Sequence, residues 1–255
     1  MAVSPLRSKT LHHGRSLSLP SYSQHPTISQ FNDNLAKIST SSSSSENTLN
    51  GLKSLYCHID DLLMLPHIQH TISQESHEKW VVDGVVDAYI RLLDACTTAK
   101  DVVSHTKHDV QHLLSALRRN DVNGIQIYQQ TSRKNSKKVI QKALKELKSL
   151  RSTKRNDLSL EKDQETVAVV YMIKEAESVT ITMFENLLSR VIGNNMQAKQ
   201  SGWSLVSKAS HQSEEMDSSH LKDMESSIQI LEQELECLFR QLIKTRVFLL
   251  NILNH

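Results

Sequence analysis

The chain has 255 residues, with 30 lysines and arginines against 28 acidic residues, and 38% of its residues are hydrophobic. Six glycines and four prolines are few for a fold with many turns, which argues against a β-sandwich or a doubly wound sheet and favours long helices. Aromatic residues make up 4% of the chain, so the core must be built from aliphatic side chains.

The first 26 residues differ in composition from the rest of the chain. They contain three of the four prolines and no acidic residue. Such a segment cannot bury enough apolar surface to offset the entropy lost on ordering. We therefore expect a disordered basic tail at 1–26 and a helical domain at 27–255. A transit peptide has a similar composition, so plastid targeting remains an alternative.

Apolar residues at helical spacing predict the first two helices of the domain. One covers Ile28 to Ile38, and a stronger one runs from about Glu46 to Leu63, after a flexible break at the serine run 41–45. The second helix should stop at Leu65-Pro66, because proline disfavours the helical conformation of the residue before it.

A long helix is then predicted from about Glu75 to Leu117, followed by a turn at Asn120 to Gly124. A basic helix extends from this turn to about Leu150, and a polar linker lies near 152–160. The basic helix and the linker belong to the same domain as the helices on either side of them.

Two further helices complete the prediction. The first runs from Glu161 to Val191, and Gly193-Asn194-Asn195 should end it as a left-handed cap. A short separate segment surrounds Trp203, and the last helix begins at about Asp217.

The last helix carries apolar residues spaced alternately by three and four, the pattern of a coiled-coil seam. The flanking positions become apolar toward its end, which favours burial in a bundle of one chain over a homodimeric coiled coil. The seam positions are Leu221, Met224, Ile228, Leu231, Leu235, Leu238, Leu242, Thr245, Leu249 and Ile252. The predicted fold is thus an all-α elongated bundle with a coiled-coil-like C-terminal helix.

Between Arg118 and Arg155 the chain has twelve basic residues and two acidic ones, while the remainder is acidic overall. Within this stretch, the lysines of the basic helix lie around an apolar stripe: Lys134, Lys137, Lys138, Lys142 and Lys145. This pattern fits a bundle helix with a solvated face, which we favour, or a helix that binds an anionic membrane or a partner groove. Sequence-specific nucleic-acid binding would need a recognisable module, and the sequence has none.

The three cysteines, Cys57, Cys96 and Cys237, lie in helical patterns among apolar neighbours and are predicted to be reduced core residues. Three histidines lie on one face of the long helix, where the last two could chelate a metal across one turn, and two more lie near Pro66. No carboxylate or cysteine motif accompanies either group, so exposed side chains are expected. These histidines are His67, His70, His105, His108 and His112. No metal site or other cofactor is predicted.

The tail contains a short motif that suggests regulation by phosphorylation. Arg15 precedes Ser18 by three residues, the spacing that basophilic kinases use, and Ser16 and Pro20 complete an Arg-Ser-x-Ser-x-Pro arrangement. This arrangement resembles the phosphoserine ligand of 14-3-3 proteins, in which an arginine cluster of the partner binds the phosphate.

Several ordered motifs of the chain resemble one plant-specific family of helical proteins, the BYPASS-related proteins. They lie at 13–21, 25–26, 52–56, 61–66, 92–101, 117–119, 132–134 and 185–188. The serine that the family pattern would place after Gly84 is replaced here by Val85. The resemblance implies a plant protein linked to root and shoot development, and it implies neither catalytic residues nor a cofactor.

The scattered glycines exclude a dinucleotide-binding fingerprint and a phosphate-binding loop, which both need clustered glycines. No apolar run approaches the roughly 18 residues needed to cross a bilayer, and no signal-peptide core is present. We therefore expect a cytoplasmic, non-catalytic interaction or regulatory protein without a small-molecule substrate. The alternative is a peripheral membrane protein held by the basic helix.

Overall fold

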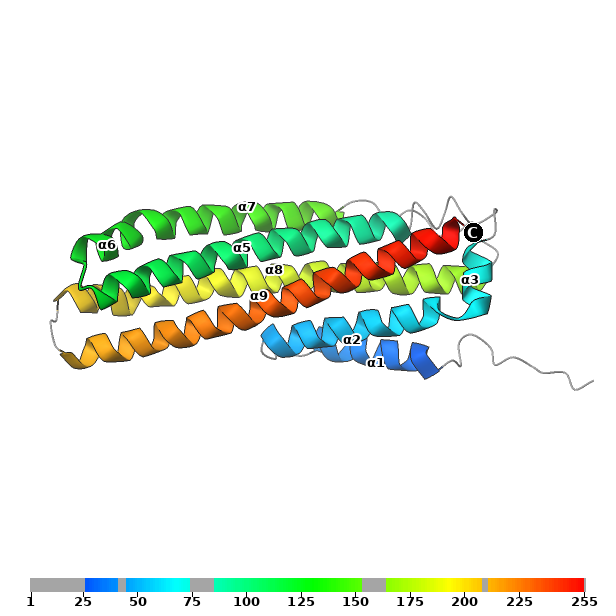
Figure 1. Ribbon diagram of the computed structural model, residues 1–255, viewed down its shortest axis with the longest axis horizontal. Coiled ribbons are helices and arrows are strands. Elements are labelled where there is room, and N and C mark those ends of the chain that lie inside the picture. Colours follow the sequence, from blue (N-terminus) through cyan, green and yellow to red (C-terminus); the bar gives the residue numbers. More distant parts are fainter. Residues whose placement is uncertain (1–25, 41–44, 74–84, 153–163, 208–210, 255) are drawn as a thin grey trace, which may run out of the picture.

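The computed structural model describes residues 26–40, 45–73, 85–152, 164–207 and 211–254. Within these ranges every regular element is helical, which confirms the predicted all-α class. The longest helices lie side by side along one axis and form an elongated bundle (Figure 1). The predicted tail before Pro26 and the predicted linker after Ser152 lie outside the described residues.

The first two helices, which the apolar spacing predicted, pack against each other. Helix α1 covers Pro26–Thr40 and α2 covers Ser45–Leu63. Phe31 and Ile38 of α1 are buried. The helices approach closely at Gly51, where an added Cβ atom would lie 2.9 Å from Ile38 Cγ1. Glycine at this position therefore permits the contact between the two helices.

A short helix that the sequence did not predict follows α2. Helix α3 covers Pro66–Ile72, and its Ile68 and Ile72 are buried. Proline ends the preceding helix, but it is well suited to the first position of a new one, because that position needs no N–H donor. Pro66 thus ends α2 and begins α3.

Helix α5 covers Asp87–Arg118, and the chain is already helical at Val85. The predicted start near Glu75 lies outside the described residues. Asn120 ends the helix in the left-handed region, with φ of 49°, while the Asp121 amide donates to the Ala116 carbonyl over 2.9 Å. Asparagine tolerates this conformation better than most residues, so it replaces the usual glycine of such a cap.

The predicted turn is narrower than expected, because α6 (Val122–Ile127) begins inside it. Asp121 caps α6 by accepting a hydrogen bond of 2.9 Å from the Gly124 amide. A π-helical turn, η3 (Tyr128–Ser132), leads directly into α7 (Arg133–Ser152), the predicted basic helix.

The last two helices are longer than predicted. Helix α8 covers Gln164–Ser207 and α9 covers His211–Leu253. The predicted cap at Gly193-Asn194-Asn195 is wrong, since α8 continues through it and through Trp203. One glycine inside a helix costs only about 1 kcal/mol relative to alanine, which does not by itself end a helix of this length.

Helices α5 and α8 run in one direction, and α2, α7 and α9 run in the other (Figure 1). Helix α9 crosses the bundle in contact with α5 and α2. Ile228, Leu235, Leu238, Leu242, Thr245, Leu249 and Ile252 of its seam are buried, and Leu221, Met224 and Leu231 are partly buried. The seam therefore packs against helices of the same chain.

Candidate interaction surfaces

The inner face of α7 belongs to the core. Ile140, Ala143 and Leu147 are buried against the helices that α7 contacts, α5 and α8. The hydroxyl of Ser136 is also buried and donates to the carboxylate of Asp109 on α5. The apolar stripe that a free amphipathic helix would insert into a membrane is therefore already covered by protein.

The outer face of α7 is strongly cationic. Its exposed lysines, which we call the basic face, are Lys134, Lys137, Lys138, Lys142, Lys145 and Lys148. All five lysines predicted as a basic surface are among them. Glu146, the one acidic residue of α7, lies 3.6 Å from Lys142 in a pair whose side chains are 81% and 50% exposed. Such a pair is weak in water, so the face keeps its positive potential.

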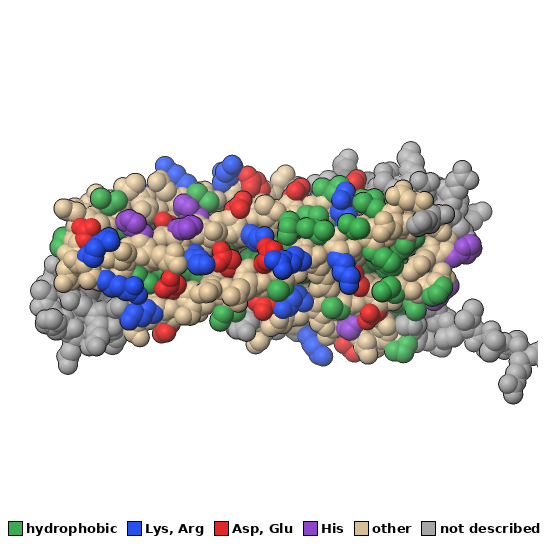
Figure 2. All heavy atoms as spheres, in the orientation of Figure 1, with side chains coloured by type: hydrophobic (Ala, Val, Ile, Leu, Met, Phe, Trp, Pro, Cys, Tyr) green, Lys and Arg blue, Asp and Glu red, His purple; other side chains and the backbone are tan. Residues whose placement is uncertain are grey.

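Three acidic residues of α9, in contrast, are paired with lysines of neighbouring helices. Glu232 lies 2.6 Å from Lys107 of α5, and Glu236 lies 2.5 Å from Lys100 of the same helix. Glu234 pairs with Lys53 of α2. Figure 2 shows the resulting alternation of cationic and acidic side chains over α5 and α9.

Hydrogen bonds from Lys100 and Arg240 lower the pKa of Glu236, so it stays ionised over a wide pH range. The Lys100 ammonium also lies 4.5 Å from the ring centre of Phe239. The charges on this side of the molecule therefore connect helices within the bundle.

A buried pair of hydroxyl groups connects α2 and α8. The Tyr56 hydroxyl lies 2.9 Å from Thr180 Oγ1, and the Thr180 hydroxyl donates to the Ala176 carbonyl over 2.7 Å. Tyr56 is therefore the donor to Thr180. Burial raises the pKa of Tyr56 and of its neighbour Tyr89, whose ring centre lies 6.3 Å away, so both remain protonated.

A bidentate ion pair connects α5 and α8. Arg91 Nε and Nη2 lie 2.5 and 3.0 Å from the two carboxylate oxygens of Glu177, whose exposed fraction is 8%. The hydrogen bond to Glu177 raises the pKa of Arg91. This pair was not predicted from the sequence, although Glu177 follows Ile173 by four residues and thus interrupts an apolar stripe. A charge within such a stripe is a usable signal of a buried pair.

A third polar tie connects α2 and α9. The Thr245 hydroxyl donates to the Asp60 carboxylate over 2.5 Å. Burial raises the pKa of Asp60, and the bond from Thr245 partly offsets that effect. Thr245 occupies a seam position, so the one polar seam residue has a partner across the helix interface.

The prediction that all three cysteines belong to the core is wrong for two of them. Cys96 is buried, whereas Cys57 and Cys237 are exposed. Each of the exposed cysteines lies next to a buried residue, Tyr56 or Leu238, and the helical turn of about 100° per residue carries it out of the core. Burial raises the pKa of Cys96 to about 12.

The histidines singled out by the sequence are exposed, as predicted: His67, His70, His105, His108 and His112. His105 Nε2 lies 3.8 Å from Asp109 Oδ2. Within the described part of the chain, no three histidine, cysteine or acidic side chains are grouped closely enough to hold a metal ion.

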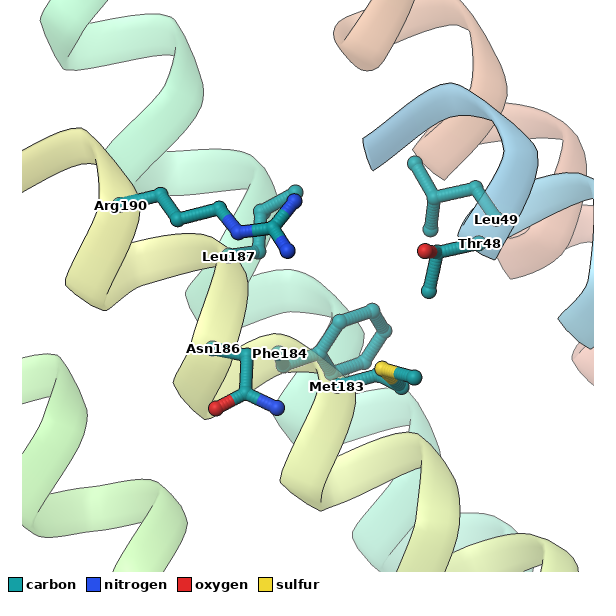
Figure 3. Close-up of a pocket in the computed structure, with 7 residues that line it drawn as sticks. All are labelled: Thr48, Leu49, Met183, Phe184, Asn186, Leu187 and Arg190. Atoms are coloured by element: carbon teal, nitrogen blue, oxygen red, sulfur yellow. The ribbon is translucent and has the colours of Figure 1, made fainter. Parts of the chain in front are cut away.

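A small pocket lies between α2 and the middle of α8 (Figure 3). Thr48 and Leu49 face Met183, Phe184, Asn186, Leu187 and Arg190 across it. Its volume is about 40 Å³. Small-molecule sites usually have roughly 300–1,000 Å³, so this pocket is far smaller than a typical substrate site.

The phosphorylation motif at Arg15, Ser16, Ser18 and Pro20 lies outside the described residues, and α1 begins six residues after it. Among the helices of the described ranges, none has the length and apolar character of a membrane span.

Residues 48–252 match the family model described as Protein BPS1. The chain belongs to the BPS1 (BYPASS1) family. The matched range begins in α2 and ends in α9, so the BPS1 match spans the interior of the bundle and the basic face. BPS1 proteins are a plant family tied to development, and the resemblance noted in the sequence is thereby confirmed. No curated protein and no solved structure matched the chain.

Proposed function

We propose that this BPS1-family member is a non-catalytic interaction protein with a regulatory role in plant development. The observation that supports this function is a contrast between two sets of charges, those paired between helices and those exposed on α7. Polar and ionic ties connect α2, α5, α8 and α9 internally, while the basic face of α7 has six exposed lysines and one acidic neighbour. A bundle whose helices are held by such contacts can present the basic face to a partner without a change of backbone conformation.

The regulatory element is the motif around Ser18. Phosphorylation there adds about two negative charges next to Arg15, in a segment without acidic residues. A partner with an arginine cluster, of which a 14-3-3 protein is the type, then binds the phosphate, while Pro20 directs the chain out of the groove. Since α1 begins at Pro26, binding does not require the bundle to unfold.

Affinity purification from plant tissue, with and without phosphatase, tests this function. Ser18→Ala should remove the 14-3-3 protein from the purified complex, and helical content should stay unchanged. Ser21→Ala is the matched control within the same tail, and Pro20→Ala should weaken binding without preventing phosphorylation. A phosphorylated peptide spanning Leu11 to Pro26 that binds 14-3-3 protein no better than its unphosphorylated form would contradict the assignment.

A second candidate function is peripheral attachment to an anionic membrane, supported by the exposed lysines of the basic face. Each cation near an acidic surface contributes roughly 1 kcal/mol and is screened within a Debye length. Sedimentation with acidic vesicles should therefore be strong at low salt and weak at high salt. Replacing Lys137, Lys138, Lys142 and Lys145 with glutamine should abolish it.

A further inference from the structure

The end of the bundle where α5 turns back into α7 carries exposed aliphatic side chains on the short helix α6. Val122 is 69% exposed, the highest fraction among the exposed large hydrophobic side chains of the described residues, and Ile127 is 57% exposed. Neither residue contributes to the core cluster. We call the segment Val122–Ile127 the α6 tip.

Local geometry fixes the orientation of the α6 tip. Asp121 caps α6 through the Gly124 amide, and Gly124 is buried against the end of α5. A Cβ atom at Gly124 would lie 2.7 Å from Asp121 Oδ2 and 3.1 Å from Ala116 Cβ. Gly124 therefore contacts the end of α5 at a point that has no space for a side chain, while Val122 and Ile127, at the two ends of α6, are exposed.

The surroundings of the α6 tip are cationic. Arg118 and Arg119 are exposed at the end of α5, and Lys134 begins the basic face two residues beyond η3. The nearest acidic residue, Asp121, accepts the capping hydrogen bond. Along the chain, the exposed aliphatic residues of the α6 tip are thus followed by the exposed lysines of α7.

We propose that the α6 tip and the basic face together bind the surface of an anionic lipid bilayer. Val122 and Ile127 enter the headgroup region, and the lysines of α7 contact lipid phosphates. This inference rests on the second candidate function and adds an orientation, with α7 lying on the membrane and α6 at the point of insertion.

The combination of side chains favours lipid over other anionic partners. Protruding aliphatic groups gain nothing from a phosphodiester backbone, whereas they gain from the apolar region below the headgroups. An acidic protein would need an apolar groove of its own to receive Val122 and Ile127. Because the apolar stripe of α7 is buried, the lysines provide the charge and the α6 tip provides the apolar contact.

The test is sedimentation of the full chain with phosphatidylcholine vesicles, with and without phosphatidylserine at about one third of the lipid. The parent should bind acidic vesicles and not neutral ones. Val122→Ser combined with Ile127→Ser should reduce vesicle partitioning about tenfold at fixed salt. The matched control is Ile243→Ser with Val247→Ser on α9, where the side chains are 41% and 48% exposed, and it should bind like the parent.

The outcomes separate the inference from the function on which it rests. If the α6-tip variant binds like the parent while the four-lysine variant does not bind, insertion is wrong and charge-driven attachment stands. No binding of the parent to acidic vesicles at low salt, or equal binding to neutral vesicles, overturns both. Retention on immobilised DNA or an acidic protein without vesicle binding overturns the choice of lipid. Circular dichroism of each variant checks that the bundle is intact.

Discussion

Helices α7 and α9 are both amphipathic and both rich in charge, yet the bundle uses their charges in different ways. Glu232, Glu234 and Glu236 of α9 each contact a lysine of another helix. The lysines of α7 face solvent, and the one intrahelical pair among them, Lys142–Glu146, is highly exposed. These acidic residues of α9 therefore connect it to neighbouring helices, whereas the lysines of α7 face solvent and only Arg151, near its end, pairs with another described helix, through Glu185 of α8.

The difference follows from position in the bundle. Helix α9 crosses α5 and α2, so residues on both flanks of its seam meet other helices. Helix α7 lies outside α5 and α8 and meets them on one side only. The same kind of amphipathic pattern thus produces charges that pair between helices where α9 crosses α5 and α2, and solvent-facing lysines on α7.

The largest effect is expected where an ion pair is least exposed. Arg91→Met removes both hydrogen bonds to Glu177 and leaves a carboxylate that is 8% exposed without its cation. The free energy of unfolding should fall by about 2–3 kcal/mol. Lys142→Met, which removes a cation from α7, should change it by less than about 0.5 kcal/mol. Denaturant unfolding measures both, and equal losses would contradict the contrast.

The buried hydroxyl pair should show an asymmetric response. Thr180→Val leaves the fully buried Tyr56 hydroxyl without its acceptor and should cost about 2 kcal/mol. Tyr56→Phe leaves the Thr180 hydroxyl bonded to the Ala176 carbonyl and should cost less than about 1 kcal/mol. Unfolding curves in denaturant compare the two variants, and the reverse order would show that Tyr56 has another partner.

A smaller effect, on the melting temperature, should distinguish the charges of α9 from those of α7. Replacing Glu232, Glu234 and Glu236 with glutamine should lower the melting temperature at low salt, and added salt should reduce the difference. The four-lysine variant of α7 should melt at the parent temperature or above, since lysines spaced by four residues repel one another. Calorimetry at two salt concentrations decides the comparison.

Thiol reactivity should separate surface from interior without affecting stability. Cys57 and Cys237 are exposed and should react rapidly with a disulfide reagent at pH 8. Cys96 is buried and has a pKa of about 12, so little of it is thiolate at pH 8. We expect Cys96 to react only when the protein unfolds. Three rapid thiols in the native protein would contradict its burial.

Periodicity was sufficient for most helices because a continuous apolar stripe needs a continuous core. It predicted the seam of α9 and the stripe of α7, and it separated the lysines of the basic face from the stripe. It failed at Gly193, where a local cap signal competes with the length of α8, and at Pro66, where one residue both ends and begins a helix. Local signals show where a helix can end, whereas packing determines where it does.

The sequence by itself determined the helical class, the family resemblance and the presence of a cationic segment, since these depend on composition, order and spacing within single elements. Only the tertiary structure decided which charged residues form ion pairs between helices. Glu177 meets Arg91 and Glu236 meets Lys100 across distances of 86 and 136 residues in the chain. The exposure of Val122 and Ile127 beside the basic face was decided in the same way. Such relations depend on how helices cross, and no spacing within one helix contains that information.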